Sequence, residues 1–178
     1  TTAFVNPFTD IHAEDYCYDA VLWAAQKGVT GGTSDTTFAP DGACTRAQAV
    51  TFLWRAAGSP EPKTLSSFAD IPAGSYYAKA VAWAVENGVA KGVSDTLFAP
   101  DAICTRAQIV TFLWRAQQSP AAGRTNPFAD ISADAYYADA VLWAVENGVA
   151  KGISSTAFAP DANCTRAQIV TFIYRCMK

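Results

Sequence analysis

The residues most suited to a chemical role are three arginines that recur at one position of a repeated pentapeptide. The sequence Cys-Thr-Arg-Ala-Gln stands at 44–48 and returns at 104–108 and 164–168. Thr followed three residues later by Gln is a capping box, in which each side chain bonds the backbone N–H of the other residue. Each copy is therefore predicted to start a helix, with Arg46, Arg106 and Arg166 at the first helical position.

A cation at this position is unfavourable for the helix itself. The N-terminus of a helix carries a partial positive charge, and an exposed cation there costs roughly 0.3–1 kcal/mol. The same end, with its free N–H groups and an added guanidinium, is a good site for an anion. The pattern leaves two interpretations open: the arginines bind an anionic ligand, or they pair with a structural Asp from another element.

Composition limits the classes of protein to which the chain can belong. It has 178 residues, of which 51% are hydrophobic and 16% charged, as in a globular domain with a sizeable core. Its net charge of −3 argues against general nucleic-acid binding, and no apolar run reaches the 18 residues of a membrane span. No charged-then-apolar leader opens the sequence, so we expect that any export signal lies outside it or has been removed.

The chain consists of three copies of one unit, at about 1–60, 61–120 and 121–178. Besides the pentapeptide, the sets Phe8/68/128, Trp23/83/143 and Phe38/98/158 share the 60-residue spacing. In the second unit, helical periodicity predicts a first helix from about Ser75 that ends at Asn87-Gly88. The capping box predicts a second helix from Arg106 to about Ala116. This helix is apolar almost all round, so the units must pack on one another. We predict an all-α single domain spanning 1–178.

Several other residues could do chemistry, but simpler roles are favoured. Cys44, Cys104 and Cys164 are interpreted as buried small residues, since a three-thiolate metal site would lack a fourth ligand. No metal or cofactor is predicted. His12 is the only histidine and has no equivalent in the other units, which argues against catalysis. The recurring aspartates are expected to accept bonds from turn amides, with a role as polar groups in a groove as the alternative: Asp10, Asp70 and Asp130. The tryptophans are expected to be core residues unless one lies at the edge of a groove, where it would stack on a sugar ring.

The first unit departs from the other two. Gly31-Gly32 stands where they have Lys91-Gly92 and Lys151-Gly152, and Thr33 replaces Val93 and Ile153. If each unit contributes to a ligand groove, the grooves are not equivalent.

Two cysteines, Cys17 and Cys176, fall outside the repeat pattern. If three units close into a ring, the third packs on the first and these two positions could meet. We predict a disulfide between them, and the alternative is two unrelated buried thiols.

The combined pattern resembles the S-layer homology repeat of bacterial cell-surface proteins. It runs Phe-x-Asp-hydrophobic, Tyr-x-x-Ala-Val-x-Trp-Ala, Asn-Gly-Val-x-x-Gly, Phe-x-Pro-Asp and Thr-Arg-Ala-Gln, and it covers essentially the whole chain. The family tetrapeptide usually ends in Glu, whereas this chain has Gln48, Gln108 and Gln168. The resemblance implies a pseudo-trimer of helical units with grooves between them.

The resemblance also implies a function and a set of contacts. Such modules are non-catalytic extracellular anchors that bind secondary cell-wall polysaccharide, often bearing ketal-linked pyruvate, and form part of larger surface proteins. Carried over, the grip on the pyruvate carboxylate falls on Arg46, Arg106 and Arg166. The backbone at Gly32, Gly92 and Gly152 and the three glutamines would line the grooves. The alternative is a protein-interaction or structural module without glycan binding. An enzyme is the least favoured reading.

Overall fold

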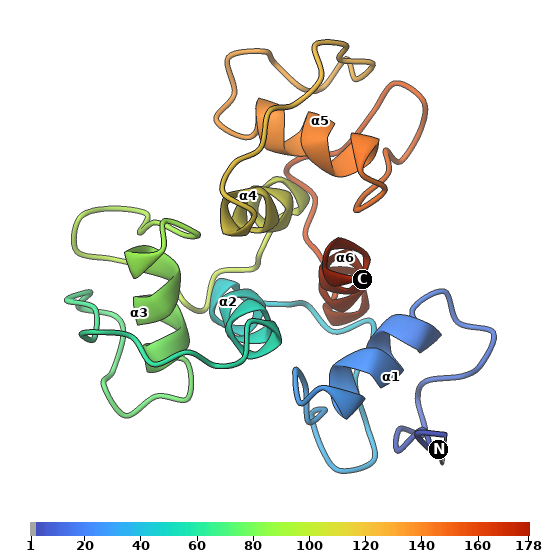
Figure 1. Cartoon of the computed structure of the whole chain (residues 1–178), viewed down its shortest axis with the longest axis vertical. Helices are drawn as coiled ribbons and strands as arrows, with labels where there is room; N and C mark the ends of the chain where they lie inside the picture. Colours follow the sequence, from blue (N-terminus) through green and yellow to red (C-terminus); the bar gives the residue numbers. More distant parts are fainter. Residues whose placement is uncertain (1–2) are drawn as a thin grey trace.

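Three pairs of helices are arranged around a pseudo-threefold axis. The structure is a computed structural model that describes residues 3–178, and the described part is built of helices and loops without a sheet. An inner triangle is formed by the helices that follow the pentapeptides: α2 (Arg46–Ala56), α4 (Arg106–Ala116) and α6 (Arg166–Met177). An outer ring holds α1 (Tyr18–Gln26), α3 (Ala78–Glu86) and α5 (Ala138–Glu146) (Figure 1). The predicted all-α fold of repeats is confirmed.

The inner helices begin where the capping box predicts. In α2, the Thr45 hydroxyl accepts the Gln48 N–H at 3.1 Å, and the Gln48 side-chain oxygen accepts the Thr45 N–H at 3.1 Å. The same reciprocal pair opens α4 and α6. Because the cap satisfies two free N–H groups without a charge, the start of each helix is fixed without the help of any ligand.

The outer helices begin later than predicted. Helix α3 starts at Ala78 rather than near Ser75, because residues 72–78 form turns in which Ser75 N–H bonds the Pro72 carbonyl. The helix ends as predicted: Gly88 adopts the left-handed conformation with φ 67°, and the Gly88 N–H bonds the Val85 carbonyl.

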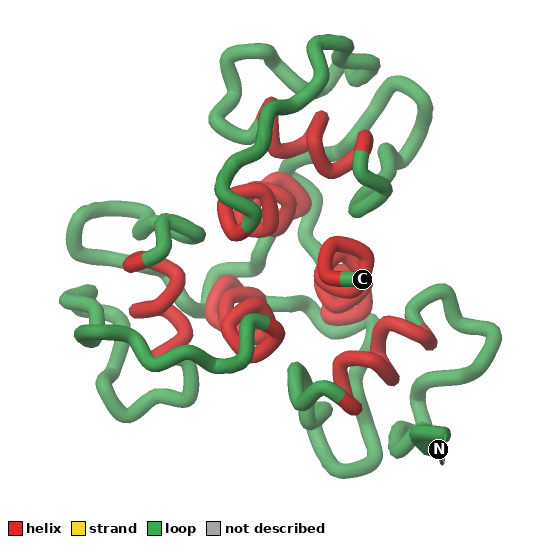
Figure 2. The backbone as a smooth tube through the Cα atoms, viewed as in Figure 1, coloured by secondary structure: helices red, strands yellow, loops and turns green. Residues whose placement is uncertain are grey.

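Outer and inner helices pair across the boundaries of the sequence repeat. Helix α2 packs on α3, α4 on α5, and α6 on α1, so each pair joins the second helix of one unit to the first helix of the next (Figure 1). Long loops, drawn green in Figure 2, connect the helices and cover the outer ends of each pair. Apolar residues of all three units form one continuous buried cluster. The exchange across boundaries follows from helices whose apolar faces no single unit can cover.

The three segments that precede the inner helices meet in a closed ring of backbone hydrogen bonds. The N–H of Cys44 donates to the Cys164 carbonyl, that of Cys164 to Cys104, and that of Cys104 to Cys44, at 3.1, 2.9 and 2.8 Å. All three cysteine side chains are buried, as predicted. Burial raises the pKa of Cys44 and Cys164 to about 12, so these thiols remain protonated and unreactive at neutral pH.

The predicted Cys17–Cys176 disulfide is absent from the structure, where both residues are free thiols. The ring does bring α6 against α1, but Cys17 lies beside Ala167 at the start of α6, in the same surface pocket. Cys176 lies nine residues further along that helix, about 13 Å at 1.5 Å per residue. A disulfide requires Cα atoms within about 7 Å of each other. The error was one of position along a helix, which the order of the units did not determine.

Candidate functional site

Three corresponding grooves lie around the molecule, and each takes residues from all three units. The motif arginine comes from one unit, a short loop and an inner helix come from the next, and a tyrosine comes from the remaining one. The grooves, named here by their arginine, have volumes of about 340 Å³ (Arg46), 250 Å³ (Arg106) and 300 Å³ (Arg166). Every residue that the sequence predicted to bind a ligand lines one of them: Arg46, Arg106, Arg166, Gly32, Gly92, Gly152, Gln48, Gln108 and Gln168.

The motif arginine is held by the loop of the next unit. Arg46 is only 5% exposed. Its Nε donates to the carbonyl of Phe98 at 3.1 Å and its Nη2 to the carbonyl of Lys91 at 2.8 Å. The guanidinium also lies over the rings of Phe98 and Phe112, with Cζ 4.7 and 5.6 Å from their centroids. Arg106 has the corresponding bonds to Phe158 and Lys151. Carbonyls and rings thus fix the guanidinium. Among the described residues, none of the three motif arginines forms a salt bridge with an Asp, which was the alternative that the sequence left open.

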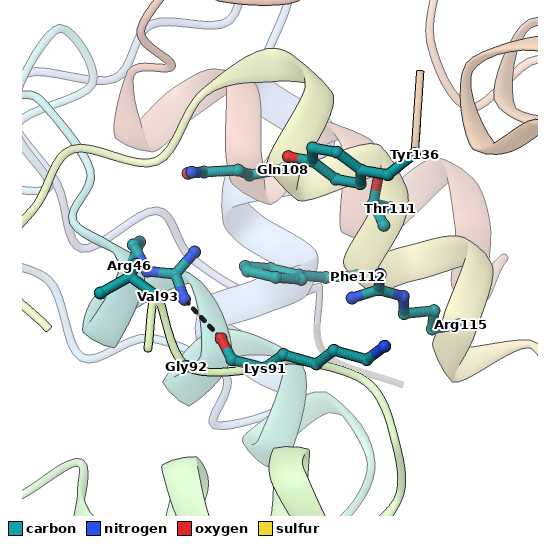
Figure 3. Close-up of a pocket in the computed structure, with 9 residues that line it drawn as sticks. All are labelled: Arg46, Lys91, Gly92, Val93, Gln108, Thr111, Phe112, Arg115 and Tyr136. Atoms are coloured by element: carbon teal, nitrogen blue, oxygen red, sulfur yellow. Dashed lines mark hydrogen bonds between the residues drawn. The ribbon is translucent and has the colours of Figure 1, made fainter. Parts of the chain in front are cut away.

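One end of this guanidinium remains available to a ligand. The Nη1 of Arg46 has no hydrogen-bond partner, and among the described residues the only buried polar side-chain atom without a partner is Ser66 Oγ. Nη1 therefore reaches solvent, and it does so on the side where Arg46 lines the groove. Figure 3 shows Lys91 along one side of this groove and Gln108 and Tyr136 along the other, with Phe112 between Arg46 and Arg115.

The inner helix contributes a stripe of groove-lining side chains, of which the sequence analysis identified only the glutamine. Gln108, Thr111, Phe112 and Arg115 stand at i, i+3, i+4 and i+7, and all four line the Arg46 groove. The stripe recurs on α2 and α6, and it ends in Arg55 and Arg175 in the other two grooves. A repeated Gln, Thr and Arg on one face of an otherwise apolar helix was the signal that could have revealed it.

Charge in the grooves is uniformly positive. Arg46, Lys91 and Arg115 line the first groove, the corresponding three cations line the second, and Arg166 and Arg55 line the third. No acidic residue lines any of the three. In a protein of net charge −3, these grooves are local sites of attraction for anions.

A tyrosine closes each groove, and it is the second feature that the sequence analysis missed. Tyr16, Tyr76 and Tyr136 line the Arg106, Arg166 and Arg46 grooves and are 59–65% exposed. They precede the outer helices, where the pattern was interpreted only as the start of a helix. Of the tryptophans, none lines these grooves, and Trp54 and Trp114 donate instead to the carbonyls of Pro60 and Pro120. The phenylalanine in each groove is at most 5% exposed, so the exposed aromatic side chains of the grooves are tyrosines.

The recurring aspartates are structural, as the favoured interpretation held. Asp70 accepts the N–H groups of Phe98 at 2.9 Å and Ala99 at 2.7 Å, and Asp10 and Asp130 do the same one unit away on either side. The alanine of each pair has φ of 58–59°, which is unfavourable for a residue with a Cβ. Two charge-assisted bonds stabilise this turn. The Phe98 carbonyl, which lies just before Ala99 in the turn, accepts the hydrogen bond from Arg46 Nε.

The groove glycines are required by close packing. A Cβ on Gly92 would lie 2.5 Å from the ring of Phe68 and 2.6 Å from the Ser94 carbonyl oxygen, and Gly152 is equally confined. Any side chain at these positions would displace the loop that holds the motif arginine. Their presence in the grooves is thus explained by structure before any ligand is considered.

Two classes of site are not found among residues 3–178. No group of three or more His, Cys, Asp or Glu side chains is arranged to hold a metal ion. No helix there combines the length and the apolar character needed to cross a membrane.

Comparison with known proteins defines the class. The family model for the S-layer homology domain matches three times, at residues 7–50, 67–110 and 127–170. The chain is 33% identical over 179 residues to the surface-layer 125 kDa protein of Lysinibacillus sphaericus, covering 98% of this chain and 15% of that protein. It is 26% identical to the cellulosome-anchoring protein of Acetivibrio thermocellus, over 88% of this chain and 34% of that protein. It is also 26% identical to the amylopullulanase of Thermoanaerobacterium thermosulfurigenes, over 94% of this chain and 9% of that protein.

These matches define the class as a non-catalytic surface-anchoring module. The chain belongs to the S-layer homology domain family. This family anchors surface proteins to the cell wall, which places the chain at the bacterial cell surface. The chain spans a small part of the relatives it matches. Two of those are enzymes by name, an amylopullulanase and an endoglucanase, so the module can accompany a catalytic domain.

Proposed function

We propose that this chain attaches the protein of which it forms part to the cell wall by binding an anionic secondary cell-wall polysaccharide in its three grooves. The observation that carries the proposal is the lining of the grooves: two or three cations, a tyrosine and no carboxylate. An acidic sugar unit fits this lining, because the guanidinium and ammonium groups pair with its acid group and the exposed tyrosine offers a face to its ring.

Ketal-linked pyruvate is the acid group that we propose. Its carboxylate is planar, and the free end of a fixed guanidinium matches a planar carboxylate by geometry as well as by charge. The guanidinium is already oriented by backbone carbonyls, so little conformational entropy remains to be lost on binding. The finer identity of the polysaccharide rests on this match and on the family resemblance.

The first experiment is sedimentation of the full chain with purified cell walls, before and after chemical extraction of the wall polysaccharide. Binding that disappears with the polysaccharide supports the proposal. Binding that survives extraction would contradict it and favour the alternative, a module that binds a wall or surface protein.

A charge-matched pair of triple variants locates the site. Arg55, Arg115 and Arg175 line the grooves, and among the described residues their only side-chain hydrogen bond is a long one, from Arg55 Nη1 to the Val29 carbonyl at 3.4 Å. Their replacement by Gln should therefore spare the fold. Each lost charge-assisted bond should weaken binding by about 1.5–3 kcal/mol, or roughly tenfold or more. The control replaces three exposed cations outside the grooves: Lys27→Gln, Lys63→Gln and Arg124→Gln. Equal loss in both variants would mean that only net charge matters and would overturn the groove assignment.

A further inference from the structure

We propose that the three grooves are of two kinds: the Arg46 and Arg106 grooves select acidic sugar units, whereas the Arg166 groove recognises sugar hydroxyls and depends less on the acid group. This inference rests on the proposed function. It would make the chain a binder of mixed specificity, able to contact acidic and less acidic units of one polysaccharide together.

The first difference is the loop that borders each groove. The loops of the second and third units read Ala90-Lys91-Gly92-Val93 and Ala150-Lys151-Gly152-Ile153, whereas the first reads Thr30-Gly31-Gly32-Thr33. The Arg166 groove therefore lacks the lysine that the other two have. Its border also has a threonine where the others have an exposed Val93 or Ile153.

The second difference is the path of the loop backbone. Thr30 is buried, at 5% exposure, and its hydroxyl accepts the Gly32 N–H at 3.0 Å. Gly32 has a φ of +79°, while Gly92 and Gly152 are outside the left-handed region. Alanines stand at the Thr30 position in the other loops and offer no such acceptor. Thr30 thus stabilises a different turn at the border of the Arg166 groove.

This turn changes what the motif arginine offers. Arg166 keeps the bond from Nε to the Phe38 carbonyl, at 2.9 Å, but its Nη2 has no bond to Gly31 like those that Arg46 and Arg106 make to Lys91 and Lys151. Among the described residues, the only buried side-chain nitrogen or oxygen atom without a hydrogen-bond partner is Ser66 Oγ. Both Nη atoms of Arg166 therefore contact solvent. Arg166 therefore has one more N–H group free for a neutral acceptor than its two counterparts.

Together these differences shift recognition from charge to hydrogen bonding. The Arg166 groove has two cations rather than three, and the Thr30 hydroxyl that lines it still has its own hydrogen to donate. One unit charge at about 5 Å in a high-dielectric setting is worth about fourfold in affinity for a monoanion. The ratio of affinities for an acidic and a neutral form of one sugar should thus be about fourfold smaller here than in the other two grooves.

Site-resolved titration of the native chain tests this ratio. The probes are a monosaccharide carrying one ketal-linked pyruvate and its methyl ester, which has no charge. The amide signals of Gly32, Gly92 and Gly152 in two-dimensional ¹⁵N spectra report the three grooves separately. We expect Gly92 and Gly152 to show a larger acid-to-ester ratio than Gly32. Equal ratios at all three glycines, or a Gly32 signal that responds to neither probe while the others respond, would overturn the inference and leave the proposed function standing.

A conversion variant provides the matched test. Gly31 is not in the left-handed region and an added Cβ meets no atom within 4 Å, so Gly31→Lys is sterically free. Combined with Thr30→Ala, it gives the first loop the residues of the other two at these positions. The acid-to-ester ratio at Gly32 should then rise about fourfold, while Lys91→Gly should lower the ratio at Gly92. A ratio at Gly32 that stays unchanged in the double variant would contradict the inference. No response at any glycine to either probe would instead refute the proposed function.

Discussion

The motif arginine serves two purposes at once, in the fold and in the groove. The sequence predicted its place at a helix N-terminus but left open whether it meets a ligand or an aspartate. The structure shows a third solution, in which backbone carbonyls and aromatic rings hold the guanidinium. Spacing along the chain could not reveal this, because both the carbonyls and the rings belong to the next unit. Replacing a motif arginine therefore tests stability as well as binding.

At the same scale, thiol chemistry gives a direct check. We expect five free thiols in unfolded protein prepared without reductant. In the native state only Cys176 should react appreciably at pH 8, because Cys17, Cys44, Cys104 and Cys164 are buried and their pKa values are raised by burial. Burial also raises the pKa of Cys176 to about 11, so its reaction should be slow. Titration with a chromogenic disulfide reagent, with and without denaturant, provides both counts. A count of three thiols in the unfolded protein would instead show that two of the cysteines form a disulfide.

Among the elements, the inner helices were predictable to the residue and the outer ones were not. A capping box is a local signal, and it fixed Arg106 as the first residue of α4. The outer helices have no side-chain cap, so their first turns depend on contacts with neighbouring loops. The pairing of α2 with α3 and of α4 with α5 was missed for a related reason. Apolar periodicity shows which face of a helix is buried, but it does not show which neighbour covers that face.

The turn at Phe158-Ala159, whose Phe158 carbonyl accepts the Arg106 Nε–H, should be sensitive to acid. The N–H groups of Phe158 and Ala159 hold the pKa of the Asp130 carboxyl below its ordinary value of 3.8. Because the carboxyl has a lower pKa in the folded state than in the unfolded state, Asp130 stabilises the fold fully at pH values above the ordinary pKa of 3.8. This stabilisation is lost as the pH falls through the folded-state pKa. Asp130→Asn should be less stable at pH 7 and should lose less stability between pH 5 and pH 2.5 than the native chain.

Urea unfolding at several pH values measures this change. The control is Asp95→Asn, at an exposed position of the second unit. An Asp130→Asn variant with the same acid dependence as the native chain would show that the turn does not depend on the carboxylate.

At the scale of the whole molecule, the sequence repeat and the packing unit do not coincide. The repeat was evident from the 60-residue spacing, and the closed arrangement followed from the need to cover apolar helices. The offset between the two was not visible, since it depends on the direction in which each unit turns towards its neighbour. One buried cluster contains residues of all three units, which favours the prediction of a single domain.

Two fragments of similar length test this prediction. Residues 65–124 form one sequence repeat and contain α3 and α4, which do not pack as a pair. Residues 40–100 contain α2 and α3, which do. At micromolar concentration neither should unfold with the cooperativity of the full chain, and 40–100 should have the higher helical circular dichroism. A sharp thermal transition of residues 65–124, close to that of the full chain, would make each repeat a domain.

The ring of cysteine backbone bonds has a consequence for assembly. Each unit donates to one neighbour and accepts from the other, and the cycle closes after three steps, as in a homotrimer with cyclic symmetry built from one heterologous interface. Two short linkers, at residues 58–62 and 119–123, keep the units together. A short flexible tether corresponds to an effective concentration of the order of millimolar. Separate copies of one unit should therefore assemble into the same ring at millimolar concentration and fall apart on dilution. In this sense the chain is a trimer whose subunits have been joined end to end.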